Sequence, residues 1–160
     1  MNCMNGKCFV DTNILVYAHD RSAGVKHDRA RTLVEQLWIS GQGVLSTQVL
    51  QELCVNLRRK VRRPWPAAEV RKLVQDYTSW EVITNSAESI IEALEIEQRY
   101  RLSFWDALIV HAAEVSGASV LYSEDFPPGQ RYHGIPVVNP LTASKGEVQG
   151  PDLISHNVGQ

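Results

Sequence analysis

Short runs of mainly apolar residues are spread along the chain and alternate with longer segments of mixed polarity. Runs of this length that are rich in β-branched and aromatic residues are typical of buried strands. The runs that predict strands are residues 8–10, 44–45, 80–84, 119–122 and 136–138. Most consecutive pairs are separated by enough chain for a helix, which is the arrangement of βαβ units.

The segments between these runs repeat apolar residues three and four positions apart, the period of an α-helix. The helices predicted from this period span residues 14–18, 27–38, 47–57, 66–77, 85–94 and 103–116. Asn85 and Ser103 each precede an acid by three residues, as in a capping box. Gly117 is suited to end the last helix.

Several large apolar side chains lie on these stripes and strands. Ile90, Ile91 and Leu94 form the helical period of residues 85–94. We expect three of the four tryptophans, on stripes or strands, to lie in the core. These are Trp38, Trp80 and Trp105.

Strands that alternate with helices predict a mostly parallel central sheet covered by helices on both faces. The expected fold class is therefore α/β, a three-layer αβα sandwich. Residues 1–142 are expected to form it as a single domain, with no internal repeat. From Ala143 onward the chain is polar and aperiodic, so residues 143–160 are expected to be a C-terminal tail with little structure.

The composition fits one ordinary globular domain and excludes several classes of protein. Of 160 residues, 44% are hydrophobic and 21% charged, which argues against disorder. Sixteen basic residues against 18 acidic residues give a net charge of −2, which excludes a uniformly basic nucleic-acid coat. A local basic patch stays compatible with this balance.

The location expected from the sequence is the cytoplasm, without membrane association. No apolar run approaches the roughly 18 residues of a membrane helix, and the N-terminus has no apolar stretch typical of a signal peptide. The three cysteines, Cys3, Cys8 and Cys54, have no metal-binding spacing, and their odd number argues against a disulfide scaffold. A reducing compartment fits this pattern.

Four acids that are far apart in the sequence are expected at one edge of the sheet. Asp11 and Asp125 follow the strands 8–10 and 119–122. Glu52 and Asp106 lie near the beginnings of helices, which gather at the same edge because each crossover helix runs antiparallel to the strands. Taken singly, each acid also fits a structural role, as a helix cap, a capping box, a solvated surface residue or a turn.

Clustered carboxylates repel one another, and a hard divalent cation such as Mg²⁺ or Mn²⁺ neutralises this repulsion by binding between them. One or two such ions activate water and stabilise the oxygens of a displacement at phosphorus. The pattern therefore predicts metal-dependent hydrolysis of phosphodiester bonds. The five histidines form no ligand pair, so a zinc site is not expected.

The residues around the four acids resemble the four motifs of PIN-domain ribonucleases, in the same order. The matching stretches are residues 9–17, 48–53, 104–109 and 121–126. Residues 134–140, Gly-Ile-Pro-Val-Val-Asn-Pro, are also similar to this family, particularly to its VapC-type toxins. The likeness extends from about residue 7 to residue 141.

The resemblance implies a PIN-like fold and an acidic quartet of Asp11, Glu52, Asp106 and Asp125 that binds Mg²⁺ or Mn²⁺, with Asp11, Asp106 and Asp125 as metal ligands. It further implies endonucleolytic cleavage of RNA, inhibition by a VapB-type antitoxin and assembly as a homodimer.

In the resembled family the neighbours of the acids assist them, which gives Asn13 and Ser123 a supporting role. Glu124 adjoins Asp125, and either could face the metal. Asp125 matches the family position.

One basic stretch stands out, formed by Arg58, Arg59, Lys60, Arg62 and Arg63. Its charge fits contact with the RNA backbone and equally fits a solvated helix end. Two further functions stay open on the sequence. One is a non-catalytic RNA-binding regulatory domain, and the other is a phosphatase with an aspartate nucleophile. The phosphatase motif has a second aspartate where this chain has Asn13.

Overall fold

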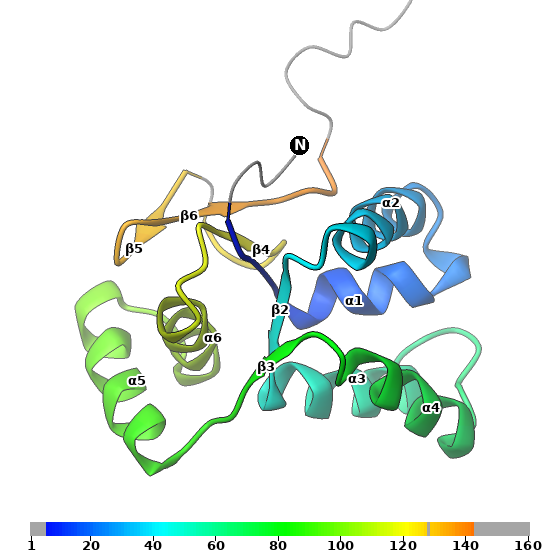
Figure 1. Cartoon of the computed structure of the whole chain (residues 1–160), viewed down its shortest axis with the longest axis horizontal. Coiled ribbons are helices and arrows are strands. Elements are labelled where there is room, and N and C mark those ends of the chain that lie inside the picture. Colours follow the sequence, from blue (N-terminus) through cyan, green and yellow to red (C-terminus); the bar gives the residue numbers. More distant parts are fainter. Residues whose placement is uncertain (1–5, 128, 143–160) are drawn as a thin grey trace, which may run out of the picture.

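The computed structural model describes residues 6–127 and 129–142. The tail expected at residues 143–160 lies outside the described residues. Along the described part the chain alternates between strands and helices, from the blue N-terminal strand to the orange C-terminal end in Figure 1. The prediction of a single domain over residues 1–142 stays a prediction.

One sheet runs through the centre of the molecule. Its strands are β1 (Cys8–Val10), β2 (Gly43–Ser46), β3 (Glu81–Ile83), β4 (Val120–Tyr122), β5 (Arg131–Tyr132) and β6 (Ile135–Val138). They are arranged in the order β3-β2-β1-β4-β6-β5. Every neighbouring pair is parallel except β5 with β6, which is antiparallel. The predicted mostly parallel sheet is therefore confirmed.

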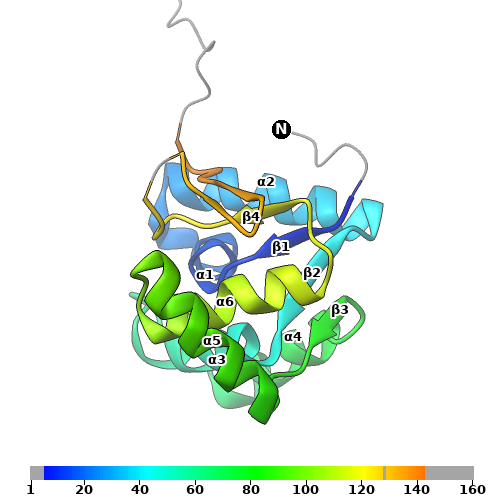
Figure 2. The same ribbon diagram turned by 90° about the vertical axis from the view of Figure 1, so that its left-hand side faces the viewer.

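Helices cover both faces of this sheet. They are α1 (Thr12–His19), α2 (Val25–Ser40), α3 (Thr47–Arg59), α4 (Ala67–Tyr77), α5 (Ala87–Tyr100) and α6 (Phe104–Val115). Figures 1 and 2 place α5 and α6 on one side of the sheet and α1 and α2 on the other, which gives the three-layer α/β arrangement. Within the described residues, no helix has both the length and the apolar character needed to cross a bilayer.

The core is densest around the central strands, because β1 and β4 are buried along their whole length. On the other side of β1, strand β2 packs against Trp80. A Cβ atom added to Gly43 would lie 2.4 Å from the Trp80 ring, so this close approach requires glycine. Trp80 is buried, as expected, and its ring contacts Tyr77 and Trp38. The expectation that Trp38 lies in the core is wrong, because Trp38 is 39% exposed at the edge of this aromatic cluster.

Two expectations about the helices on the other face are wrong. Trp105 is 63% exposed and lies outside the core, because it occupies the open first turn of α6. In α5 the apolar period at Ile90, Ile91 and Leu94 faces outward, and Ser89, Ala93 and Ile96 are buried instead.

The beginning of α5 also differs from the expectation, because its N-cap is Ser86 rather than Asn85. The capping box joins Ser86 to Ser89, the residue three positions further on. The box needs only a side chain that can hydrogen-bond back to the N-cap, and the serine hydroxyl meets that need as an acid does.

Candidate active site at the carboxyl edge of the sheet

The four acids predicted from the sequence occupy the carboxyl edge of the sheet and the helix beginnings beside it. Asp11 follows β1 as the N-cap of α1, and Asp125 follows β4. Glu52 lies in α3, whose N-cap is Ser46 at the end of β2. Asp106 lies in the first turn of α6, where its backbone N–H donates to Ser103 Oγ (3.1 Å). Two strand ends and the beginnings of two helices thus bring the four acids to the same region.

Asp11 is the most buried of the four, only 5% exposed. The backbone N–H of Thr12 donates to Asp11 Oδ1 (2.7 Å), and the hydroxyl of Ser123 donates to Oδ2 (2.7 Å). Burial raises the pKa of Asp11 to about 7 despite these two hydrogen bonds, and the charges of Glu52 and Asp125 raise it further. Asp11 therefore exchanges its proton close to neutral pH.

Asp106 is half-buried and shares this electrostatic environment. Burial raises its pKa most strongly, and the charges of Asp125 and Glu52 add to the shift, while a hydrogen bond with Ser103 opposes it. Because Glu52 and Asp125 act on both Asp11 and Asp106, the four carboxylates form one interacting group.

Glu52 is held by two side chains that were not identified from the sequence. Thr12 Oγ1 donates to Glu52 Oε2 (2.7 Å), and Gln48 Nε2 donates to Glu52 Oε1 (2.9 Å). Gln48 Nε2 also lies 3.1 Å from the backbone oxygen of Trp105, which ties α3 to the first turn of α6. Their positions were the only signal in the sequence: Thr12 adjoins Asp11, and Gln48 precedes Glu52 by one helical turn.

The two expected supporting residues contact the acids directly. Asn13 Nδ2 donates to Asp125 Oδ2 (2.8 Å) and lies 3.4 Å from Ser123 Oγ. The backbone N–H of Asp125 also donates to Ser123 Oγ (3.2 Å). Since Ser123 donates to Asp11 as well, this one hydroxyl connects the loop after β4 to the end of β1.

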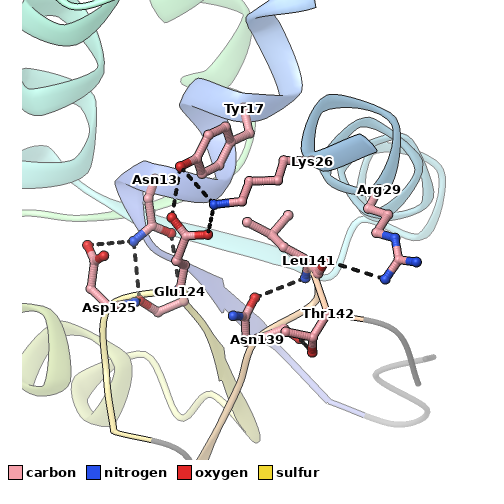
Figure 3. A network of polar contacts seen from close by, with 10 residues as sticks. Asn13, Tyr17, Lys26, Arg29, Glu124, Asp125, Asn139, Leu141 and Thr142 are labelled. Carbon is pink, nitrogen blue, oxygen red and sulfur yellow. Dashed lines mark hydrogen bonds and ion pairs between the residues drawn. The ribbon is translucent and has the colours of Figure 1, made fainter. Parts of the chain in front are cut away.

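The neighbouring acids Glu124 and Asp125 point to different partners (Figure 3). Tyr17 Oη donates to Glu124 Oε1 (2.8 Å), and Lys26 Nζ lies 2.8 Å from Glu124 Oε2. These partners lower the pKa of Glu124 although its partial burial opposes the shift. Asp125 instead faces Asn13, as Figure 3 shows. The geometry therefore places Asp125, and not Glu124, in the acidic group.

The donor chemistry of this group fits a hard divalent cation, because all four acids offer only oxygen. Each carboxylate oxygen has lone pairs for two partners. The oxygens of Asp11 and Glu52 each accept one of the hydrogen bonds described above. In residues 6–127 and 129–142, no three histidine, cysteine, aspartate or glutamate side chains already surround one point at coordination distance. Binding such a cation requires the acids to turn toward a common point.

The basic stretch lies at the far end of α3 from its N-cap. Arg58 and Arg59 form the last turn of α3, Lys60 is its C-cap, and Arg62 and Arg63 follow in the loop. All five are exposed. None of them is a neighbour of the acids in the sequence, but Glu52 and Arg59 are seven residues apart and share a helix face.

Among the solved structures similar to this chain are a toxin and toxin–antitoxin complexes. VapC20 of Mycobacterium tuberculosis, described as a toxin that cleaves the sarcin–ricin loop, is 25% identical, with 74% of this chain and 90% of that chain covered and a TM-score of 0.59. A toxin–antitoxin complex from Klebsiella pneumoniae is 21% identical, with coverage of 84% and 98% and a TM-score of 0.60.

A third structure is VapBC2 from Rickettsia felis, bound to a DNA fragment from its promoter. It is 20% identical, with 82% of this chain and 97% of that chain covered and a TM-score of 0.58. The complexes from Klebsiella pneumoniae and Rickettsia felis are less than 25% identical to this chain, so they show that it shares their fold. No functionally curated protein matches the sequence.

The sequence profile of the PIN domain matches residues 8–126, which is most of the chain and contains all four acids. The match begins at β1 and ends just after Asp125, so it spans the edge at which the carboxylates meet. The chain therefore belongs to the PIN domain family.

Proposed function

We propose that the chain is a metal-dependent endoribonuclease that hydrolyses phosphodiester bonds at this acidic edge. The observation that carries the proposal is the interacting group of four carboxylates, in which burial raises the pKa of Asp11 to about 7. Such a group exchanges its proton for a cation near neutral pH. Family membership supports the proposal, because PIN homologues are nucleases and generally use divalent metal ions.

In this proposal Asp11, Asp106 and Asp125 hold the ion, Mg²⁺ or Mn²⁺. When bound, the ion lowers the pKa of a water molecule and stabilises negative charge on the phosphate. Glu52 accepts the proton of the attacking water at one of its carboxylate oxygens. Thr12 fixes the orientation of that carboxylate through its 2.7 Å hydrogen bond.

The positions of the acids depend on residues that bridge distant parts of the chain. Ser123 holds Asp11, and Asn13 holds Asp125, so each supporting residue orients an acid that lies on the other strand's loop. Hydrogen-bond partners of this kind orient the ligands of a metal site. The proposal therefore gives Asn13 and Ser123 a positioning role.

The basic stretch gives the RNA backbone a path away from the acids. Arg59 follows Glu52 by seven residues on the same face of α3, roughly 10 Å along the helix axis at 1.5 Å per residue. Arg58, Lys60, Arg62 and Arg63 extend the positive charge from there. Phosphate neutralisation supplies most of the affinity for nucleic acid, so these cations are placed to hold the strand that leaves the site.

Removing divalent ions is the direct test of the proposed reaction. We expect the purified chain to cleave single-stranded or structured RNA, EDTA to abolish the cleavage, and added Mn²⁺ or Mg²⁺ to restore it. The measurement is the appearance of new RNA ends by sequencing and gel electrophoresis. RNA that binds tightly but stays intact over a screen of metals contradicts the proposal and favours a regulatory RNA-binding domain. A trapped phospho-aspartate favours the phosphatase.

The basic stretch has its own expected result. We expect the double variant Arg59→Gln, Arg62→Gln to weaken RNA binding about equally for all sequences, because phosphate contacts carry no sequence information. The slope of log affinity against log salt concentration should fall by roughly 1.4, because each neutralised phosphate of single-stranded RNA contributes about 0.7. Arg31→Gln, an exposed arginine of α2 paired with Glu35, is the matched control. An unchanged slope in the double variant contradicts the assignment.

The biological role that we propose is the toxin of a toxin–antitoxin pair. Toxin–antitoxin complexes are among the solved structures with this fold, which supports a VapB-type antitoxin as a partner. A homodimer is the proposed assembly. A gene for a small DNA-binding protein beside this one, whose product copurifies with the chain and stops its RNA cleavage, tests the partner. Light scattering of the purified chain measures the assembly.

A further inference from the structure

Trp105 is an exposed aromatic residue that adjoins an acid of the active site in the chain. It precedes Asp106 in the first turn of α6. Its exposed fraction is 63%, whereas tryptophan side chains are on average highly buried. An indole that lies mostly in solvent contributes little to the packing of the fold, which points to a ligand.

The position of Trp105 is fixed by the same contacts that fix the acids. Gln48, itself only 4% exposed, donates from Nε2 both to the backbone oxygen of Trp105 (3.1 Å) and to Glu52 Oε1 (2.9 Å). The rings of Trp105 and Phe104 meet edge to face with centroids 5.3 Å apart. Phe104 packs against the core. These contacts fix the backbone of Trp105 relative to Glu52, and they leave the indole packed against Phe104 with most of its surface in solvent.

We propose that Trp105 stacks on an unpaired base of the RNA, next to the phosphate at which cleavage occurs. This inference rests on the proposed function. A phosphate held at the acids brings its attached sugar and base close to the first turn of α6. Trp105 is the exposed aromatic residue in that turn. Every base presents a π face, so the contact is sequence-tolerant and favours single-stranded over paired RNA.

A second copy of the chain is the competing occupant of this surface. The exposed apolar side chains Ile90, Ile91 and Leu94 belong to α5 and contribute no contact to the acidic group, so they offer no comparable argument for RNA. Trp105 differs from them because its backbone oxygen accepts a hydrogen bond from Gln48, the residue that also orients Glu52. Ile91, 65% exposed, is therefore a matched control for the loss of an exposed apolar side chain.

The test compares two probes in the full chain carrying Asp11→Asn, which slows cleavage so that binding is measured on intact RNA. One probe is a fluorescein-labelled single-stranded oligoribonucleotide, and the other is an oligomer of the same length made of abasic nucleotides. We expect Trp105→Ala to weaken binding of the first probe about tenfold and to leave the abasic probe unchanged. Trp105→Tyr should restore binding to within roughly threefold, and Ile91→Ala should change neither affinity.

Three results overturn the stacking role. The first is equal affinity of Trp105→Ala and its parent for the base-bearing probe. The second is an equal loss for both probes. The third is a halved mass by light scattering for Trp105→Ala, which assigns Trp105 to a subunit contact. Cleavage of RNA by the wild-type chain shows that the proposed function holds even if the stacking role fails. A wild-type chain that neither cleaves RNA nor binds either probe overturns the stacking role and the proposed function together.

Discussion

Replacing Asp11 with asparagine is expected to reduce kcat/KM for RNA cleavage by roughly a thousandfold. The substitution keeps the size of the side chain and removes the charge from the most buried carboxylate of the site, which is 5% exposed. An amide is a poor ligand for Mg²⁺ compared with a carboxylate, so the ion binds more weakly at this position. The measurement is a progress curve of RNA cleavage at saturating Mn²⁺.

The fold should survive this substitution, because the asparagine can keep both hydrogen bonds of Asp11. Its Oδ1 accepts from the Thr12 N–H, and its Nδ2 donates to Ser123 Oγ, whose hydroxyl rotates to suit. Asp76→Asn makes the same chemical change at an exposed aspartate of α4 and should leave the rate unchanged. A variant at Asp11 that folds and cleaves at more than about a tenth of the wild-type rate contradicts the metal-ligand assignment.

The meeting of the four acids was predictable because it depends on topology. Once strands and helices alternate, the chain direction fixes that Asp11 and Asp125 follow neighbouring parallel strands. The choice between Glu124 and Asp125 was not predictable in the same way. It depends on Tyr17 and Lys26, which lie about a hundred residues away in the sequence and meet Glu124 only in the folded chain.

The exposed side chains of α5 and α6 show where periodicity reaches its limit. A helical period identifies an apolar face but not whether another element covers it. Ile91 and Trp105 have the spacing of buried residues, but no other element covers them.

Strand β5 was missed for a different reason, because a strand of two residues is too short to show an alternating period. Thr12 and Gln48 were missed because neither is an acid, although both orient Glu52.

The burial of Asp11 should also make the metal-free protein less stable as the pH rises. The pKa of Asp11 is raised from 3.8 to about 7 by folding, so the folded chain holds a proton that the unfolded chain has released between these values. Stability that depends on a raised pKa is complete below the unfolded pKa and is lost as pH rises through the folded pKa. Each pH unit in this window lowers the free energy of unfolding by about 1.4 kcal/mol.

Comparing the wild type with Asp11→Asn isolates the contribution of Asp11 and of its coupling to Glu52 and Asp125, because groups outside the acidic group titrate alike in both. Asparagine mimics the protonated acid at every pH. In EDTA, the variant should gain stability relative to the wild type at about 1.4 kcal/mol per pH unit up to pH 7, and the difference should then level off. Urea unfolding at half-unit steps from pH 5 to pH 8 measures this difference.

Divalent ions should reverse the effect in the wild type alone, which connects the stability of the protein to its site. A cation that binds the folded chain at a hundred times its Kd adds about 2.7 kcal/mol to the free energy of unfolding. At pH 8 we expect Mn²⁺ to stabilise the wild type by this order and Asp11→Asn far less, because the variant lacks the charge of the buried ligand. A stability difference that is independent of both pH and Mn²⁺ means that the Asp11 carboxylate has an ordinary pKa and binds no ion. If the difference follows both, the charge that destabilises the metal-free fold is the charge that holds the metal.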